Sequence, residues 1–168
     1  MDKIGIFYGS TTGNTRDVTR ILYEALGKNQ AEMHDIRETT ALDMAAYEKI
    51  IFAVSTWGTG DLQDDWEEFF PNLNSIDFTG KTVAIMALGD QHNYPDTFVN
   101  CMLLLAEKVT ERGGRIVGET STEGYEFSAS MAVRNKKFLG LVIDEDNQAN
   151  MTTARIHDWV QAIKKAFQ

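Results

Sequence analysis

The chain has 168 residues, a formal net charge of −9 and a single cysteine. The length suits one domain spanning residues 1–168, and an acidic chain without a basic patch disfavours nucleic-acid binding. No apolar run reaches the roughly 18 residues of a membrane span, so we expect no membrane insertion. Because no secretory leader is evident and Cys101 cannot form an internal disulfide, we expect a cytoplasmic protein.

Strand-like and helix-like patterns alternate along the chain. Apolar runs predict buried strands at 4–8, 49–54 and 82–88 and, in two pieces, at 115–118 and 138–143. A weaker strand pattern lies at 31–36. Helical patterns lie between them, at 18–26, 41–46, 66–73, 98–109 and 156–167. Repeated βα units indicate a doubly wound α/β fold, in which a parallel sheet has helices on both faces. Ligands of such sheets bind beyond the carboxyl ends of the strands.

The loop between the first strand and the first helix has the composition of an anion site. Gly9 and Gly13 let the backbone approach a ligand, and the helix N-terminus supplies free N–H groups. Neutral side-chain donors come from Ser10, Thr11, Thr12, Asn14 and Thr15. A nucleoside-triphosphate loop would carry lysine where Asn14 stands, and a dinucleotide loop would carry three glycines. The loop therefore predicts one terminal phosphate held by neutral groups, with a plain Ser/Thr helix cap as the alternative.

Two further loops on the same edge each carry an aromatic side chain beside small residues. Trp57 follows the third strand and precedes Gly58–Gly60, and Tyr94 follows Gly89 and Asp90 after the fourth strand. Either aromatic alone could cover the edge of a core, but together above a phosphate loop they predict a slot for a flat ring. The expected ligand is a planar heterocycle joined to one phosphate, and flavin mononucleotide (FMN) fits that description.

These motifs resemble those of the long-chain flavodoxins, and the resemblance covers essentially the whole chain. It rests on five segments in matching order: Gly9–Thr15, Thr56–Trp57, Leu88–Tyr94, Glu123–Phe127 and Asp144–Gln148. It implies a five-stranded parallel sheet of order 2-1-3-4-5 with FMN at the switch point, an arrangement for which flavodoxin is itself the standard example. It also implies that an insertion at about 119–137 splits the fifth strand.

The resemblance further implies non-covalently bound FMN and its contacts. The phosphate would be held by Ser10, Thr11, Thr12, Gly13, Asn14 and Thr15. The isoalloxazine ring would lie between Trp57 and Tyr94, flanked by Thr56, Gly58, Thr59, Gly60, Leu88, Gly89, Asp90 and Asn93. In the family, the peptide that matches Gly58–Thr59 turns over on reduction, so that its carbonyl accepts the new flavin N5–H. Asn93 stands where long-chain relatives commonly carry glycine, and His92 beside it could couple the flavin potential to pH.

The implied activity is low-potential one-electron transfer, with FMN shuttling between semiquinone and hydroquinone and no catalytic residues in the protein. Negative charge near the flavin would lower its potential, and the carboxylates expected there are Asp61, Asp64, Asp65, Glu67, Glu68, Asp90, Asp144 and Asp146. The implied partners are redox proteins, such as a photosystem or a reductase of the ferredoxin/flavodoxin–NADP type. The acidic segment 61–68 is the docking surface we expect, on a monomer.

Two other protein classes share this architecture. A response-regulator receiver needs a phosphorylatable aspartate after the third strand, where Ser55 stands, so it is disfavoured. An FMN-dependent quinone or nitro reductase is the alternative, although no catalytic acid or base is evident beside the flavin loops. Oxidation of NAD(P)H by the protein alone would distinguish such an enzyme from a carrier. No Cys/His cluster has metal-ligand spacing, so we expect no metal.

Overall fold

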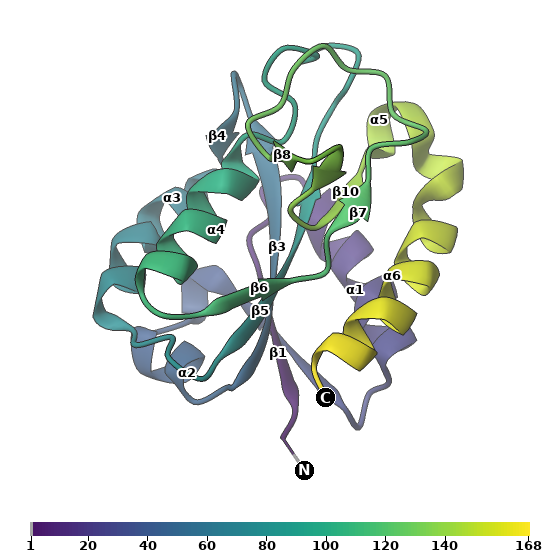
Figure 1. The fold of residues 1–168 in the computed structure, drawn as a ribbon. Helices are drawn as coiled ribbons and strands as arrows, with labels where there is room; N and C mark the ends of the chain where they lie inside the picture. The colour runs from purple at the N-terminus through teal and green to yellow at the C-terminus, as the bar shows by residue number, and fades with distance from the viewer. Residues whose placement is uncertain (1) are drawn as a thin grey trace.

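A computed structural model describes residues 2–168, which form a twisted parallel sheet between two layers of helices (Figure 1). The sheet has the order β10-β5-β3-β1-β2, and β6 also pairs with β5. Its parallel strands are β1 (Ile4–Tyr8), β2 (Ala31–Asp35), β3 (Lys49–Trp57), β5 (Thr82–Leu88), β6 (Arg115–Val117) and β10 (Leu141–Ile143). With β6 and β10 taken as two halves of one strand, the predicted order 2-1-3-4-5 and the α/β fold class are confirmed.

Each central strand contributes side chains to two separate cores, one on each face of the sheet. In β3, Ile50 and Phe52 lie in one core, whereas Ile51 and Ala53 lie in the other. Successive side chains of a strand point to opposite faces, so a strand covered on both faces must be apolar throughout. This requirement explains the unbroken apolar run from which β3 was predicted.

Helices α1 and α6 cover one face of the sheet, and α3 and α4 cover the other (Figure 1). The helices are α1 (Asn14–Leu26), α2 (Ala41–Ala45), α3 (Asp64–Phe69), α4 (Cys101–Glu111), α5 (Glu145–Gln148) and α6 (Thr152–Ala166). The 3-10 turns are η1 (Ile36–Glu38), η2 (Phe70–Ser75) and η3 (Ala149–Met151). Within residues 2–168, no helix combines the length and the apolar character needed to cross a membrane.

Two helices are shorter than the apolar pattern predicted. The pattern placed Phe98 on the fourth helix, but α4 begins at Cys101, because Val99 has a φ of 47°, outside the helical range. Phe98 is nevertheless buried. The acidic helix α3 ends at Phe69 and the chain continues as the 3-10 turn η2, because Pro71 cannot donate the N–H that a longer α-helix needs.

The segment between the two halves of the fifth strand forms a small antiparallel sheet. Its order is β7-β9-β8, and its strands are β7 (Thr120–Ser121), β8 (Val133–Arg134) and β9 (Lys137–Phe138). The prediction that the fifth strand resumes at Phe138 is wrong, because that residue pairs with β7 and β8 and the main sheet resumes only with β10. We call residues 119–138 the insertion.

Candidate cofactor-binding site

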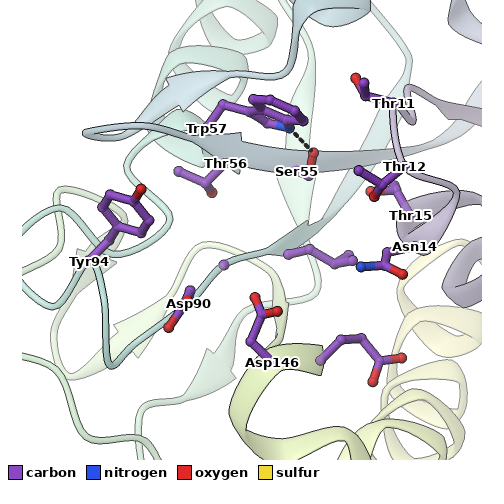
Figure 2. A pocket seen from close by; sticks show the side chains of 13 residues that line it. Thr11, Thr12, Asn14, Thr15, Ser55, Thr56, Trp57, Asp90, Tyr94 and Asp146 are labelled. Carbon is purple, nitrogen blue, oxygen red and sulfur yellow. Dashed lines mark hydrogen bonds between the residues drawn. The ribbon is translucent and has the colours of Figure 1, made fainter.

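The carboxyl ends of β1, β3 and β5 lie side by side at one edge of the sheet, and the loops that follow them enclose a cleft (Figure 2). The cleft is lined by Thr11, Thr12, Asn14, Thr15, Ser55, Thr56, Trp57, Leu88, Gly89, Asp90, Tyr94, Glu145 and Asp146. Three predicted loops thus meet in one place, and the start of α5 adds a fourth wall.

The loop between β1 and α1 is held in shape by hydrogen bonds on its far side. Gly13 has a φ of 95°, a left-handed conformation that favours glycine, and its N–H donates to Ser10 Oγ (3.0 Å). Ser10 therefore stabilises the turn and does not line the cleft. Thr11 Oγ1 accepts a hydrogen bond from the buried Gln63 Nε2 (2.9 Å), which joins this loop to the residue before α3.

The cleft side of the same loop presents polar donors. Thr12, Asn14 and Thr15 line it beside the first turn of α1, whose N–H groups lack an intrahelical acceptor (Figure 2). The guanidinium of Arg16 lies close by, since its Nη2 is 3.1 Å from the place that a Cβ on Gly13 would occupy. Neutral donors, a helix N-terminus and one neighbouring cation make this end of the cleft suited to an anion.

Trp57 lies at the end of β3, because that strand extends beyond the predicted limit of residue 54. It pairs with β4 (Asp61–Leu62) in a short hairpin whose turn is Gly58–Gly60. Gly58 has a φ of 53° in this turn. The indole Nε1 of Trp57 donates to Ser55 Oγ (3.0 Å), so the ring is oriented over the cleft although 39% of the residue is exposed (Figure 2).

The loop after β5 carries Tyr94, which is 43% exposed, and is organised by Asp90. Asp90 Oδ1 accepts from the N–H groups of His92 (3.1 Å) and Asn93 (3.0 Å) and from Asn147 Nδ2 (2.9 Å). Burial alone would raise the pKa of Asp90, but the hydrogen bonds outweigh it and hold this pKa below its usual value. Asn93 therefore folds back on the aspartate and does not line the cleft.

An acidic cluster lies at the Tyr94 end of the cleft. One carboxylate oxygen each of Asp90, Asp144 and Asp146 lies within 4.8 Å of the others. Asp146 is exposed, and its pKa is raised by partial burial and by the negative charges of Asp90 and Asp144. The polar donors of the loop before α1 and the carboxylates of the Tyr94 loop and of α5 thus line different walls of the cleft.

Most of the residues predicted from sequence line the cleft. These are Thr11, Thr12, Asn14, Thr15, Thr56, Trp57, Leu88, Gly89, Asp90 and Tyr94. The predicted residues that belong to the same loops but do not line it are Ser10, Gly13, Gly58, Thr59, Gly60 and Asn93. Sequence reasoning missed three lining residues as contacts: Ser55, Glu145 and Asp146. Strand register would have indicated the first, because Ser55 lies opposite Leu88 in the sheet.

Fold and cleft together define a class of protein: a doubly wound α/β protein with a site for a phosphorylated planar cofactor. The flavodoxin family model matches residues 6–159. The flavodoxin of Nostoc sp. is 43% identical over 165 residues, covering 98% of this chain and 97% of that protein. Flavodoxin 1 of Escherichia coli is 40% identical over 162 residues, and the match covers 96% of this chain and 92% of that protein. The crystal structure of Fusobacterium nucleatum flavodoxin bound to FMN has a TM-score of 0.93 at 34% identity and covers 100% of both chains.

The chain belongs to the flavodoxin family, and the full-length match places it in the long-chain type. The predicted family is therefore confirmed. The protein is an FMN-dependent, low-potential electron carrier whose partners are redox proteins, and it is not a catalytic enzyme.

The raised pKa of Asp146 yields a prediction about stability. A carboxyl group whose pKa is higher in the folded than in the unfolded protein stabilises the fold only in its protonated form. This contribution to the free energy of unfolding is fully present below the usual pKa of 3.8, and it is lost as the pH rises through the raised pKa of the folded protein. Asp146→Asn should therefore stabilise the flavin-free protein at neutral pH, by less than about 1 kcal/mol because solvent screens the group.

Urea unfolding of wild type and variant at neutral and at acid pH measures this effect, and the difference should shrink as pH falls. Asp158→Asn, which removes an exposed carboxylate on α6 outside the acidic cluster, is the matched control. A destabilised Asp146→Asn protein at neutral pH would contradict the prediction.

Proposed function

We propose that this cleft holds FMN with its phosphate at residues 11–15 and its ring between Trp57 and Tyr94. We also propose that the protein delivers single electrons from a reductase or photosystem to acceptor redox proteins. The observation that carries the proposal is the meeting, in one cleft, of a hydroxyl-lined helix N-terminus and two half-exposed aromatic side chains.

The charge asymmetry of the cleft supports this orientation of the cofactor. A phosphate at the α1 end meets the threonine hydroxyls, the free N–H groups of the helix and the nearby Arg16. At the opposite end, the same phosphate would face Asp90 and Asp146 and be repelled. The phosphate therefore belongs beside α1, and the uncharged ring belongs beside Tyr94.

The exposure of the two aromatic side chains supports their role in stacking. Trp57 and Tyr94 are 39% and 43% exposed, whereas the core tryptophan Trp66 is fully buried, so both cleft aromatics have ring surface available to a ligand. Offset stacking on such rings adds about 0.5–1.5 kcal/mol per pair beyond the area buried. Thr56, between them in the cleft, is anchored to the buried Cys101, with Oγ1 and Sγ 3.2 Å apart.

FMN, when bound, supplies the one-electron chemistry, and the carboxylates of this chain set how readily it is reduced. Asp90, Glu145 and Asp146 line the cleft and raise the free energy of any negative charge placed in it. A carboxylate roughly 10 Å away at an effective dielectric constant near 20 contributes about 1.7 kcal/mol. For one electron this corresponds to about 70 mV, so a few such groups, partly screened, make the potential low.

The acidic segment after Trp57 is the docking surface that we propose for a basic reductase of the ferredoxin/flavodoxin–NADP type. Asp61 is exposed and pairs with Trp57 in the hairpin, and Asp64, Glu67 and Glu68 are exposed on α3, which follows it. Asp65 is different, because its carboxylate accepts from Gln63 Nε2 (2.9 Å) and pairs with Arg37 (3.8 Å). We therefore assign docking to the four exposed carboxylates and a structural role to Asp65.

We also propose that the protein acts as a cytoplasmic monomer. Cys101 is fully buried and burial raises the pKa of its thiol to about 12, so it is unsuited to forming a disulfide between two copies. The high net negative charge of −9 also disfavours association between copies.

The direct test of the proposed function is an anaerobic reductive titration of the purified, FMN-loaded protein, followed by visible absorption. A one-electron carrier should be reduced in two separate one-electron steps, and it should need a separate reductase to accept electrons from NAD(P)H. Reduction in a single two-electron step, or oxidation of NAD(P)H by the protein alone, would contradict the proposal.

Gly58→Ala tests the flavin-side turn. Gly58 has a φ of 53°, a conformation that glycine adopts without strain. If the Gly58–Thr59 peptide turns over on reduction, as in the family, Gly58 must also reach a second backbone conformation, and glycine, which lacks a Cβ, does so at lower cost than alanine. Gly58→Ala should therefore destabilise the semiquinone relative to the oxidised state and make the first one-electron potential more negative by some tens of millivolts. Gly80→Ala is the matched control, since Gly80 has a φ of 81° with no neighbour within 4 Å of an added Cβ. Equal potentials in wild type and Gly58→Ala would refute the role.

Charge reversal tests the docking surface. Asp64→Lys combined with Glu67→Lys should slow reduction by a basic reductase at low ionic strength, by about tenfold or more, and the difference should shrink at high salt. Stopped-flow reduction at several salt concentrations measures this. The control, Asp158→Lys, changes an exposed acid on α6 and should leave the rate unchanged. An unaltered rate for the double variant at low salt would contradict the assignment of docking to these carboxylates.

A further inference from the structure

We propose that Gln91 is a positioning residue for the flavin: it joins a buried carboxylate of the main fold to the backbone of the insertion and so fixes the loop that carries Tyr94. The inserted segment would then have a defined function, which is to hold the ring-stacking wall of the cleft in place. This inference rests on the proposed placement of FMN between Trp57 and Tyr94.

Every polar group of the Gln91 side chain is used for this connection. Gln91 is 1% exposed, and both its N–H (3.1 Å) and its Nε2 (2.7 Å) donate to Asp144 Oδ2. Its Oε1 accepts from the N–H of Glu126 in the insertion (2.6 Å). Although Tyr94 lies only three residues away, the Gln91 side chain makes no hydrogen bond within its own loop.

Asp144 is a buried carboxylate whose oxygens accept hydrogen bonds from neutral donors. It is fully buried at the end of β10, and within residues 2–168 no lysine, arginine or histidine nitrogen lies within 4 Å of its oxygens. Besides Gln91, it accepts from the N–H (3.0 Å) and Nδ2 (2.9 Å) of Asn147. A buried charge without a counter-ion depends on every hydrogen bond it receives, so Gln91 is held firmly by it.

The insertion holds the Tyr94 loop from the other side as well. Pro95, the residue after Tyr94, has a carbonyl that accepts from the N–H groups of Ser128 (2.8 Å) and Ala129 (2.9 Å). Tyr94 thus lies between two residues, Gln91 and Pro95, that are both hydrogen-bonded to the insertion. The backbone N–H of Tyr94 donates within the loop itself, to Asp90 O (3.0 Å).

The insertion is rigid enough to serve as a support. Tyr125 donates its hydroxyl proton to Val142 O (2.6 Å) in β10, and the Arg155 guanidinium lies over its ring at 4.0 Å. Phe127 packs against Phe98 and Phe138, with ring centroids 5.3 and 5.4 Å apart. The residues that hold the Tyr94 loop are therefore fixed to the main sheet and to α6.

The test compares binding of FMN and of riboflavin, which has the same ring but no phosphate. Gln91→Met roughly preserves the side-chain volume and removes the two side-chain hydrogen bonds, to Asp144 and from Glu126, while the bond from the Gln91 N–H to Asp144 remains. We expect the substitution to weaken binding of both ligands by about tenfold, because it disturbs the contacts to the ring that FMN and riboflavin share. The contacts to the phosphate are left intact, so the ratio of the FMN affinity to the riboflavin affinity should not change. The first one-electron potential should change as well, because the stacked wall is no longer fixed.

Gln91→Asn is the milder variant, kept in case the methionine protein fails to fold. Its amide is retained but is one methylene too short to span Asp144 and Glu126, so it should give the same direction of change. Ile163→Val, on the buried face of α6, is the control. It should lower the free energy of unfolding without altering the riboflavin affinity or the first one-electron potential.

Unchanged riboflavin affinity and potentials in a folded Gln91 variant would overturn the proposal and leave Gln91 a purely structural residue. Failure of wild-type protein to bind FMN or riboflavin would instead overturn the placement of the flavin in this cleft. The two failures are therefore distinguishable in the same set of titrations.

Discussion

Burial of the sheet on both faces is the constraint on which the rest of this structure depends. A strand such as β3 must supply apolar side chains alternately to two cores, so its backbone runs through the centre of the molecule and ends at the surface. Because β1, β3 and β5 are parallel neighbours, their carboxyl ends reach the same edge. The polar and glycine-containing loops can only follow at that edge, and there they meet as one cleft.

The second organising feature is a buried charge that has no counter-ion within the described chain. Asp144 is stabilised by Gln91 and Asn147, and Asn147 also reaches Asp90, so one small network connects β10, α5 and the loop after β5. Such a network is stable only when every donor and acceptor is paired. It gives the loop beside the cleft a fixed geometry without apolar packing, which leaves Tyr94 exposed and available to a ligand.

The fold also shows where the carboxylates of this acidic chain lie. Carboxylates at the Tyr94 end of the cleft and along α3 flank the two aromatic side chains, whereas the α1 end offers neutral donors and Arg16. In the placement that we propose for FMN, the polar donors would attract the phosphate and the carboxylates would disfavour reduction of the ring. Exposed carboxylates also lie beside the edge of the cleft, where a basic partner can approach.

The sequence by itself determined the alternation of strands and helices, the sheet order through its family resemblance, and the loops of the site. Apart from the sheet order, these features depend on local composition: apolar periodicity, glycine at Gly13 and Gly58, and hydroxyl side chains before α1. Only the tertiary structure decided where β3 ends, why Phe98 lies outside α4, and that Phe138 belongs to the insertion. It also decided that Ser55, Glu145 and Asp146 line the cleft while Ser10 and Asn93 do not. The end of β3 and the place of Phe138 depend on strand pairings between separate segments, which no local pattern encodes. Ser10 and Asn93 are turned away from the cleft by hydrogen bonds to residues three positions away, whose geometry becomes evident only in the folded loops.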